Sequence, residues 1–579
     1  MKRKLVSRML TLLLTSSMLL TAAGCGGTAA ESGSVAAAVE EEAAEDAVSD
    51  EKTVFDENGV SGKGQLPITK DETTLDVFIE SISYISDIEE NQTFKTLEER
   101  TNLRLDMEIV PEENSKEKLN LLLLGDDYPE VIMGAYILTT TDVITYGTEE
   151  QILIPLNDLI DEYCVNLQER WEEMPGLKEA MTSPDGNIYG IPVVDAGGRG
   201  HTDVGYKLWI NEEWLKNLGL EEPTNTEEFR AVLEAFRDQD PNGNGIKDEI
   251  PMTGCTNNWG AHPYYALINC FGYFNQDGVD GAYYMKDGEI QTVYDQDYLR
   301  EALEYIAGLY ADGLIDPASF SQIDTQLQAV GNDPDIERIG VAASGHPGVF
   351  MDINNVERAS QYEALAPMAG PDGYQSIPYK KDTPVTAFNF AITDKCKNPE
   401  AAIKMMDLFC GEEWSLIGNV GEQGVEWDYA DEGMVNMYGE PATYKYLESE
   451  RKATEDRQSY SWSWIFRCVE PAYLDKFAME GDIRDPLNYA AFLTTETAKF
   501  APYAADVDIM PTLKMDEDTS VQFNTLKTMV DDYVDQAIVE FIVGDRDTET
   551  DWDTYLADLK KLGYYDEIQM VKDAVAAQQ

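Results

Sequence analysis

The sequence predicts an α/β protein with more than one folded lobe. Between about residues 74 and 134, strand-like and helix-like stretches alternate, which is the rhythm of a parallel sheet covered by helices. The chain has 579 residues, more than one ordinary domain contains. Its composition is 43% hydrophobic and 10% aromatic, so it carries enough apolar side chains to fill two or three cores.

The first sheet is expected to begin at TLDVFIE (74–80), whose alternation and β-branched residues are typical of a strand. A helix is expected from about Thr93 and a strand from about Arg104. SKEKLNLLLLGDDYPEVIMG continues as helix, loop and strand. The turn residues of SPDGNIYGIP then precede an expected strand at Ile188–Val194. This order predicts successive βαβ units.

The remaining elements follow the same kinds of signal. GYKLWINEEWLKNLG (205–219) predicts a strand and a helix that ends at Gly219. The next helix is expected to have Thr224 as its N-cap and Glu227 in a capping box. GVAASG (340–345) and AFNFAIT (387–393) are strand-like, and the C-terminal region is helical. The residues Trp209, Trp214 and Trp552 fall within these elements, and we expect them to be core residues.

The N-terminal segment predicts export and a lipid anchor. MKRKLVSR is basic, an apolar stretch follows, and AAGC ends the pattern. We interpret 1–24 as a signal peptide, Cys25 as the lipidated residue, and 25–70 as lipid anchor and disordered tether. The alternative is an ordinary signal peptide with an incidental cysteine. No other run approaches the ~18 apolar residues that a membrane span needs.

Charge and cysteine content exclude several classes of function. Lys plus Arg number 43 and Asp plus Glu 109, a net charge of −66. Such a polyanion repels phosphate backbones, so a nucleic-acid partner is excluded. The six cysteines after Cys25 form no C-x-x-C pair, so a thiolate zinc site is not expected. Disulfides and buried free thiols both remain open for them.

The stretch DQDPNGNGIKDEIP (238–251) resembles an EF-hand calcium loop. Asp240, Asn242 and Asn244 occupy positions 1, 3 and 5, and Gly245 occupies position 6, where such a loop turns. Position 12 is Pro251 instead of glutamate. The expected ligands are Asp240, Asn242, Asn244, the carbonyl of Ile246, Asp248 and Glu249. The alternative is an Asx-rich surface turn. We expect a calcium ion here to be structural.

Several segments, in order along the chain, resemble family 1 extracellular solute-binding proteins of bacterial ABC importers, in particular the large lipoproteins related to alginate- and oligosaccharide-binding proteins. These segments are FKTLEERTNLRLDMEIVP, LNLLLLGDDYPEVI, DGNIYGIPVV, LWINEEWLKNLGL, PTNTEEFRAVLEAFRDQDPNGNGIKDEIP and LYADGLIDPASF. The resemblance covers about residues 70–579 and is weaker between about 430 and 510. Related proteins carry the same D-x-N-x-N-G-x-x-D-E pattern as a calcium site.

The resemblance implies a type II periplasmic-binding-protein-like fold with two lobes and a ligand cleft between them. Lobe one would comprise 70–193 and 340–380, and lobe two 200–335 and 385–579. The protein would be a monomer, anchored through lipid on the extracellular face of the bacterial membrane. It would capture a carbohydrate and deliver it to ABC permease subunits, which an ATPase drives.

Carbohydrates are held by aromatic faces and by side-chain hydrogen bonds to hydroxyls. Aromatic residues beside polar groups in loops, and acids at the carboxyl ends of strands, are therefore candidates for the ligand site. The expected ligand-binding residues are Trp259, His262, Tyr264, Glu80, Asp127, Trp427, Trp462 and Trp464. For Trp427 and Trp464, core packing is the alternative. We expect a neutral oligosaccharide unless Arg199, Lys207 or Arg467 faces the ligand.

Two other functions remain open from the sequence. A secreted glycosidase would need a pair of carboxylates at the reacting bond, and 109 acids make such a pair impossible to exclude. However, the chain has no G-x-S-x-G, H-E-x-x-H or Walker-type motif, so no enzyme activity is expected. A binding protein for peptides or another non-sugar solute is the second alternative.

Overall fold

A computed structural model describes residues 53–577, apart from 82–87, 89, 126, 175, 193–199, 201–202, 276–280, 380–386, 448–474, 512, 514 and 516. Two sheets organise this part of the chain, and each has its own hydrophobic core. The predicted lipidation site Cys25 lies outside the described residues.

The first sheet has five strands in the order β2-β1-β3-β11-β4. These are β2 (Leu103–Pro111), β1 (Thr73–Ser81), β3 (Val131–Leu138), β11 (Phe388–Ile392) and β4 (Gly190–Pro192). β1 is parallel to β2 and β3, whereas β11 is antiparallel to β3 and β4. The predicted βαβ units are therefore confirmed for β1, β2 and β3.

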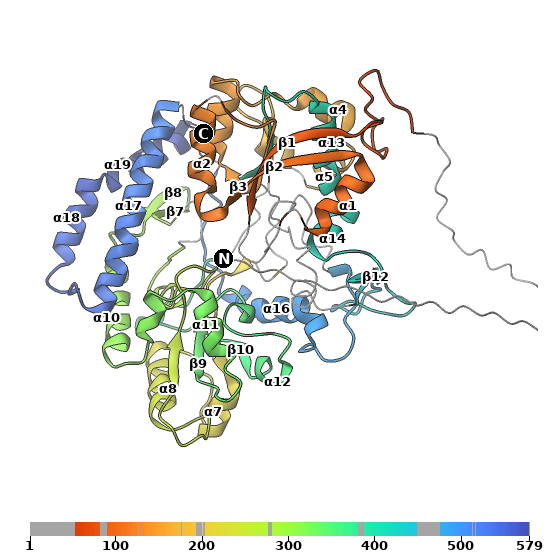
Figure 1. The fold of residues 1–579 in the computed structure, drawn as a ribbon. Coiled ribbons are helices and arrows are strands. Elements are labelled where there is room, and N and C mark those ends of the chain that lie inside the picture. The colour runs from red at the N-terminus through yellow and green to blue at the C-terminus, as the bar shows by residue number, and fades with distance from the viewer. Residues whose placement is uncertain are drawn as a thin grey trace, which may run out of the picture. The chain divides into compact units, whose positions relative to one another are not determined.

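Helices cover both faces of the first sheet, because β1 is apolar on both faces. Leu75, Val77 and Ile79 belong to one core cluster and Phe78 belongs to the other. Of the helices labelled in Figure 1, α1 and α2 contact β2, and α13 contacts β11. The helical segments of this region are α1 (Gln92–Thr101), α2 (Glu112–Leu124), α3 (Thr140–Val143), the π-helix Ile144–Glu149, α4 (Asn157–Tyr163), α5 (Asn166–Glu173), α6 (Leu177–Met181), α13 (Pro399–Phe409) and α14 (Glu412–Asn419).

The second sheet has four strands in the order β10-β5-β9-β6. These are β10 (Tyr362–Ala364), β5 (Leu208–Asn211), β9 (Ile339–Ala343) and β6 (Ile250–Thr253). β6 and β9 are parallel, and β5 is antiparallel to β9. Two hairpins stand apart from the sheets: β7 (Tyr283–Lys286) with β8 (Glu289–Thr292), and β12 (Trp427–Tyr429) with β13 (Tyr444–Tyr446).

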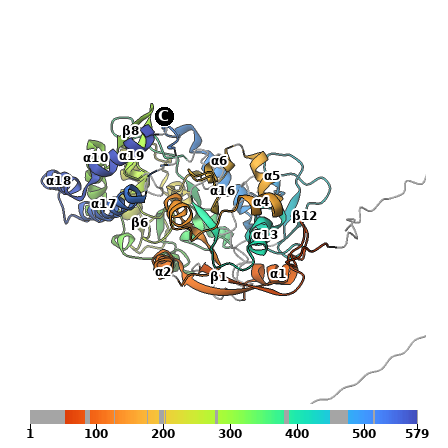
Figure 2. The same ribbon diagram turned by 90° about the horizontal axis from the view of Figure 1, so that it is seen from above.

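The second core is covered by helices from distant parts of the chain. α17 lies beside α10, and α18 and α19 pack against α17, as Figures 1 and 2 show. The helices are α7 (Glu212–Leu218), α8 (Thr226–Asp238), α9 (Tyr265–Ile268), α10 (Asp297–Ala311), α11 (Asp324–Gly331), α12 (Val356–Ala359), α16 (Tyr489–Ala498), α17 (Glu517–Val543), α18 (Trp552–Leu562) and α19 (Tyr564–Ala577). Short 3-10 turns occur at Pro317–Phe320, Pro347–Val349, Pro486–Asn488 and Ala501–Tyr503.

Sheet pairing changes the expected division into lobes. β9 and β10 were assigned to lobe one but pair within the second sheet, whereas β11 was assigned to lobe two but pairs within the first. α13 and α14 pack into the core of the first sheet as well. β9 and β11 are short and buried at every position, so their apolar patterns are compatible with either sheet.

Most of the expected local features are present in the structure, but the N-cap of α8 lies one residue later than expected. The N-cap is Asn225, whose side-chain oxygen accepts from the N–H groups of Glu227 and Glu228. Thr224 instead donates its N–H and hydroxyl to the Glu228 carboxylate. Trp209, Trp214 and Trp552 are buried, as expected. Cys164, Cys255, Cys270 and Cys396 carry free thiols.

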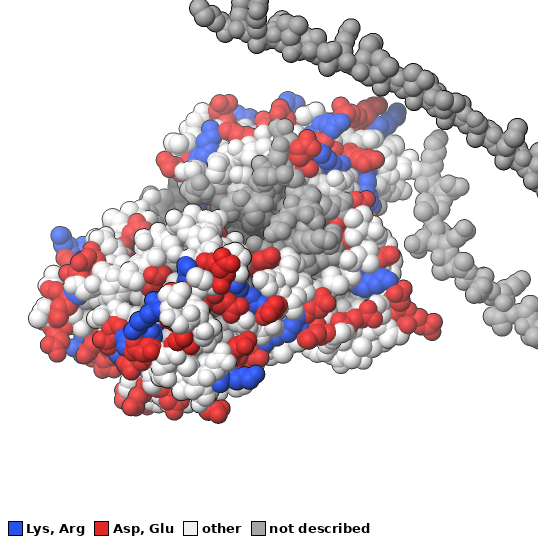
Figure 3. All heavy atoms as spheres, turned by 60° about the horizontal axis from the view of Figure 1, so that its bottom comes forward, with Lys and Arg blue, Asp and Glu red and all other residues white. Residues whose placement is uncertain are grey.

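On the face drawn in Figure 3, acidic side chains outnumber basic ones, which are interspersed among them. The salt bridges are mostly between exposed groups, for example Lys95 with Glu90 and Lys247 with Asp238. Such pairs contribute little to stability in water. Among the described helices, none is both long and apolar enough to cross a membrane.

One carboxyl group is enclosed where α19 packs on α17. Glu567 is 0% exposed, and neither of its side-chain oxygens has a hydrogen-bond partner among the described residues. Burial, together with the negative charge of Asp531, raises the pKa of Glu567 to about 7, although the ammonium of Lys527 opposes the shift. The folded protein therefore holds a proton on Glu567 more tightly than the unfolded chain does.

We predict that replacing Glu567 with Gln removes a pH dependence of stability. Because the folded pKa is raised, the protonated carboxyl's contribution is present below its unfolded pKa of about 4.3 and is lost as the pH rises through about 7. Between pH 5 and pH 8, the wild-type protein should lose about 2–3 kcal/mol of unfolding free energy relative to E567Q. Urea unfolding at both pH values measures this, with the exposed D573N on the same helix as control. An equal pH slope in wild type and E567Q would contradict it.

Candidate functional site

Loops from three strands meet at one edge of the second sheet. β6 and β9 are parallel, so both end at this edge, and the antiparallel β5 begins there. Residues 254–259 follow β6, 344–346 follow β9, and 203–207 precede β5. Open α/β sheets place their ligands at the carboxyl ends of parallel strands. This edge is therefore the candidate site.

The loop that carries Trp259 is fastened to the start of α11. Asn257 and Asn258 donate their side-chain amides to the two carboxylate oxygens of Asp324, at 3.2 and 3.0 Å. The backbone N–H of Asp324 donates to Asn257 Oδ1 at 2.8 Å. Thr256 adds a backbone bond to the carbonyl of Gln322. The Trp259 side chain is held on this loop and remains partly exposed.

Lys207 lies beneath this edge with its ammonium group inside the protein. The residue is 0% exposed. Its Nζ donates to the carbonyl oxygens of Val204 and Gly345, and it lies 5.4 Å from the centroid of the Trp259 ring. Burial lowers the pKa of Lys207 to about 7, and the carboxylates of Asp203 and Glu496 only partly offset this effect.

His262 and Tyr264 are part of a packed aromatic group that adjoins the site. The His262 ring lies 5.4 Å from that of Tyr264 and 4.8 Å from that of Tyr265. Burial lowers the pKa of His262, so its imidazole is neutral at pH 7. Tyr264 is 2% exposed and belongs to the second core. The expectation that Tyr264 presents its ring to a ligand is contradicted, because the ring is enclosed by core residues.

The other expected ligand-binding residues lie elsewhere. Glu80, at the end of β1 in the first sheet, is buried and accepts from the Ser115 hydroxyl at 2.6 Å. Asp127 is exposed after α2. Trp427 is 3% exposed, its ring packs on Tyr444, and its indole N–H donates to the carbonyl of Gly421. Trp427 is therefore a core residue, the alternative left open from the sequence.

Trp462 and Trp464 lie outside the described residues, as do Arg199 and Arg467. Conversely, sequence reasoning did not identify Gly345 and His346 as site residues; they follow β9 after Ser344. His346 Nδ1 lies 3.2 Å from the hydroxyl oxygen of Tyr489. Gly345 ends the strand-like segment GVAASG (340–345), so its position at the carboxyl end of that segment was the available signal.

The acidic loop lies at the opposite edge of the sheet, where β6 begins. Asp240 accepts from the N–H of Gly245, Asn242 from that of Asn244, and Asn244 from that of Ile246. Gly245 has a φ of 74°, which permits the sharp turn expected at position 6. The oxygens of positions 1, 3 and 5 therefore point into the loop, as a cation-binding loop requires.

Glu249 supplies the strongest indication that this loop suits a cation. Its Oε1 is buried without a hydrogen-bond partner in the described part of the chain. Burial raises the pKa of Glu249, and the negative charges of Asp248 and Asp240 add to the shift. No three His, Cys, Asp or Glu side chains within the described ranges form a metal-binding group. Asparagine and backbone oxygens would have to complete the ligand set.

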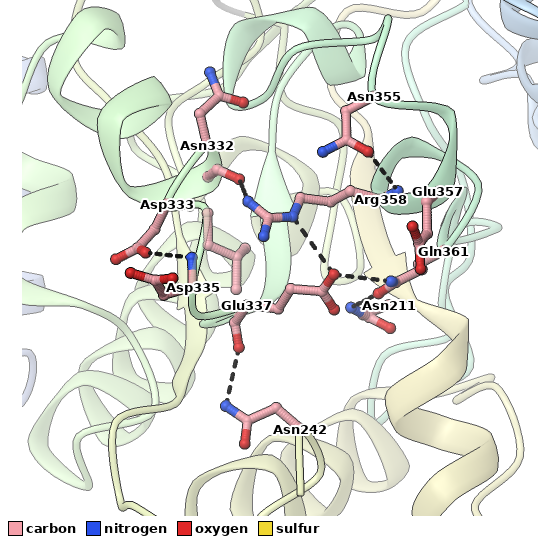
Figure 4. A network of polar contacts seen from close by, with 12 residues as sticks. Asn211, Asn242, Asn332, Asp333, Asp335, Glu337, Asn355, Glu357, Arg358 and Gln361 are labelled. Atoms are coloured by element: carbon pink, nitrogen blue, oxygen red, sulfur yellow. Dashed lines mark hydrogen bonds and ion pairs between the residues drawn. The ribbon is translucent and has the colours of Figure 1, made fainter. Parts of the chain in front are cut away.

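A polar network ties this loop to the start of β9 and to α12 (Figure 4). Asn242 donates to the backbone carbonyl of Glu337 at 3.0 Å. The Glu337 carboxylate accepts from Gln361 at 3.0 Å and pairs with Arg358 at 3.5 Å. Gln361 in turn accepts from Asn211 at 3.1 Å. The loop is thereby joined to three strands of the second sheet.

Comparison with known proteins relates most of the chain to one family. The family model described as bacterial extracellular solute-binding protein matches residues 86–414. The fructooligosaccharide ABC transporter substrate-binding protein FusA of Streptococcus pneumoniae serotype 4 is 30% identical over 505 residues, which cover 84% of this chain and 89% of FusA.

Solved structures extend this similarity. FusA of S. pneumoniae in complex with kestose has a TM-score of 0.73 at 26% identity, covering 87% of this chain and 99% of that one. An EF-hand mutant of FusA in complex with fructo-nystose has a TM-score of 0.72 at the same identity and coverage. The alginate-binding protein AlgQ2 without calcium ion has a TM-score of 0.66 at 22% identity, covering 88% and 99%, and shows a common fold.

We predict that the buried Lys207 makes stability rise with pH. Its folded pKa of about 7 lies below the unfolded value of about 10.4, so the unfolded chain binds more protons between these values. Between pH 7 and pH 9 the wild-type protein should gain up to about 2.7 kcal/mol of unfolding free energy relative to Lys207→Met. Denaturant unfolding at both pH values gives the difference, with the exposed K572M as control. A constant difference across this range would count against the prediction.

Proposed function

The chain belongs to the bacterial extracellular solute-binding proteins, and we propose that it captures an extracellular oligosaccharide and delivers it unaltered to the permease of an ABC importer. Its two-sheet fold is the two-lobed fold of that family, as the sequence predicted. Its relative FusA is a fructooligosaccharide-binding protein of an ABC transporter. The observation that carries the proposal is the partly exposed Trp259 at the carboxyl edge of β6 and β9.

The chemistry of this edge favours a neutral sugar over an anionic one. An indole face can contact the C–H surface of a sugar ring, and Asn257 and Asn258 precede Trp259 on the same loop. The Lys207 ammonium is buried and already bonded to two backbone carbonyls, so it does not serve as a counter-ion for a uronate. The net charge of −66 repels anionic ligands further.

Capture in this proposal requires contacts from both lobes. The first lobe contains the five-stranded sheet with α13 and α14, and the second contains the four-stranded sheet with α17, α18 and α19. A ligand favours a closed arrangement only if it binds that arrangement better than the open one. Trp259 would supply the contact from the second lobe.

A structural calcium ion in the loop after α8 is the second part of the proposal. Asp240, Asn242, Asn244, the carbonyl of Ile246, Asp248 and Glu249 would hold it. The buried Oε1 of Glu249, which has no hydrogen-bond partner among the described residues, supports this assignment, because a divalent cation would offset the crowded carboxylates. The ion would fix the loop and the starts of β6 and β9, and it would take no part in chemistry on the solute.

The remaining parts of the proposal concern the cellular setting. A lipid on Cys25 would hold the protein, as a monomer, on the outer face of the cell membrane, with 25–70 as tether. The partners would be the permease subunits. The relatives are substrate-binding proteins, and the proposed role involves no enzyme activity.

Replacing Trp259 with Ala should weaken binding of kestose, a neutral fructooligosaccharide, by about 1 kcal/mol or more, roughly fivefold in Kd. The loss follows from removal of the apolar face against which the sugar packs. Isothermal titration calorimetry measures it. Tyr429→Ala is the matched control, because Tyr429 is an exposed aromatic residue on β12, outside this edge. Unchanged affinity of W259A would show that the site lies elsewhere.

Removal of calcium should lower the melting temperature whether or not sugar is present, since the proposed ion holds a loop and not a ligand. Thermal unfolding with and without EGTA measures the effect, and elemental analysis gives the calcium content. Asp240→Asn keeps the acceptor for the Gly245 N–H but removes one charge, so it should weaken calcium binding and shrink the EGTA effect. The control variant D573N should keep the full EGTA effect on the melting temperature. A calcium-free purified protein with no EGTA shift would refute the proposal.

A further inference from the structure

The Trp259 indole lies directly on the backbone of Gly345, in space that a side chain would need. A Cβ atom placed on Gly345 would lie 1.9 Å from Trp259 Cε3 and 2.3 Å from Cζ3. Such distances are far inside van der Waals contact, so any side chain at this position would displace the six-membered ring. Gly345 also donates its N–H to the carbonyl of Trp259 at 2.9 Å. The residue therefore contacts both the ring and the backbone of Trp259.

The backbone around the indole is equally close-packed. Gly260 has a φ of 67°, and a Cβ there would lie 2.0 Å from the carbonyl oxygen of Gly205 and 2.9 Å from the nitrogen of Gly345. Lys207 joins the same segments, because its ammonium donates to the carbonyls of Val204 and Gly345. The three loops of the candidate site thus form one packed unit around the Trp259 side chain.

The backbone conformation of Gly345 does not itself require glycine. Gly345 is not among the residues with positive φ, so alanine could adopt its conformation without strain. A side chain is excluded at this position because the Trp259 indole occupies the space that it would need. Contact with Trp259, and not the backbone conformation after β9, therefore requires glycine at 345.

We propose that Gly345 is a positioning residue for ligand capture: it lets the Trp259 indole rest on the sheet edge in one fixed orientation before a sugar arrives. This inference rests on the proposed function of Trp259. Its physical basis is preorganisation, since a ring that is already ordered loses no conformational freedom when the ligand binds. Lys207 supports the arrangement by holding the Gly345 carbonyl.

A double-mutant cycle with G345A and W259A tests this. In the wild-type background, G345A should weaken kestose binding at least fivefold in calorimetry, as W259A does, and lower the urea midpoint. In the W259A background the clash is absent, so adding G345A should change Kd less than twofold and leave the midpoint unshifted. The matched control is Gly272→Ala, whose Cβ would lie 2.3 Å from the Tyr298 ring. G272A should lower the midpoint and leave Kd unchanged.

The outcomes separate this inference from the proposed function. Wild-type affinity in a folded G345A would overturn it, and so would a further loss of affinity or midpoint when G345A is added to W259A. If G345A alone fails to fold, the inference requires that the G345A/W259A double variant still folds. A double variant that also fails to fold would show that Gly345 has a general structural role. If W259A binds kestose normally, the proposed sugar site is wrong, while the stability half of the cycle still decides whether Gly345 accommodates the indole.

Discussion

The parallel pairing of β6 with β9 is the constraint on which the candidate site depends. Met252 lies opposite Val341 and Thr253 opposite Ala342, so the two strands start at one edge of the sheet and end at the other. At the first edge the acidic loop precedes β6, and Glu337 and Arg338 precede β9. At the second edge Trp259 and Gly345 follow them. Loops separated by almost 90 residues in the sequence meet at each edge because these strands are in register.

Ionisable groups buried in the second lobe show how the interior differs from the surface. The chain as a whole carries a charge of −66, yet Lys207 and Glu567 are both 0% exposed. Burial shifts both pKa values toward 7 and favours the neutral form of each. Lys207 is compensated by backbone carbonyls, whereas Glu567 has no hydrogen-bond partner among the described residues. Burial therefore desolvates both groups, although the Lys207 ammonium is hydrogen-bonded and the Glu567 carboxyl is not bonded to any described residue.

The sequence predicted what depends on local pattern. The strands and helices from β1 to β3 and the core faces of α8 follow from periodicity and capping signals, and the family followed from ordered segments. Which strands pair could not be predicted, because β9 and β11 are buried at every position and have no solvent-exposed face to indicate their sheet. Whether Tyr264 and Trp427 are buried or exposed also depends on tertiary packing, since an aromatic residue in a loop-like segment can equally fill a core. The position of Gly345 at a strand end was a signal, but its role could not be predicted, because that role depends on contact with the ring of Trp259, 86 positions earlier.

The separation of the two edges allows one short sheet to hold the acidic loop and the candidate site independently. β6 has four residues, so at about 3.3 Å per residue roughly 13 Å separates its ends. The acidic loop is held by the network through Glu337 and Gln361 at one end, and the Trp259 loop is held by Asp324 at the other. Each loop thus has its own set of anchoring side chains. The bonds of Asp324 to Asn257 and Asn258, and the contacts of Gly345 and Lys207 with the indole, do not involve the acidic loop. Order at the edge that carries Trp259 is therefore built into that edge's own contacts and does not have to be transmitted through the strands.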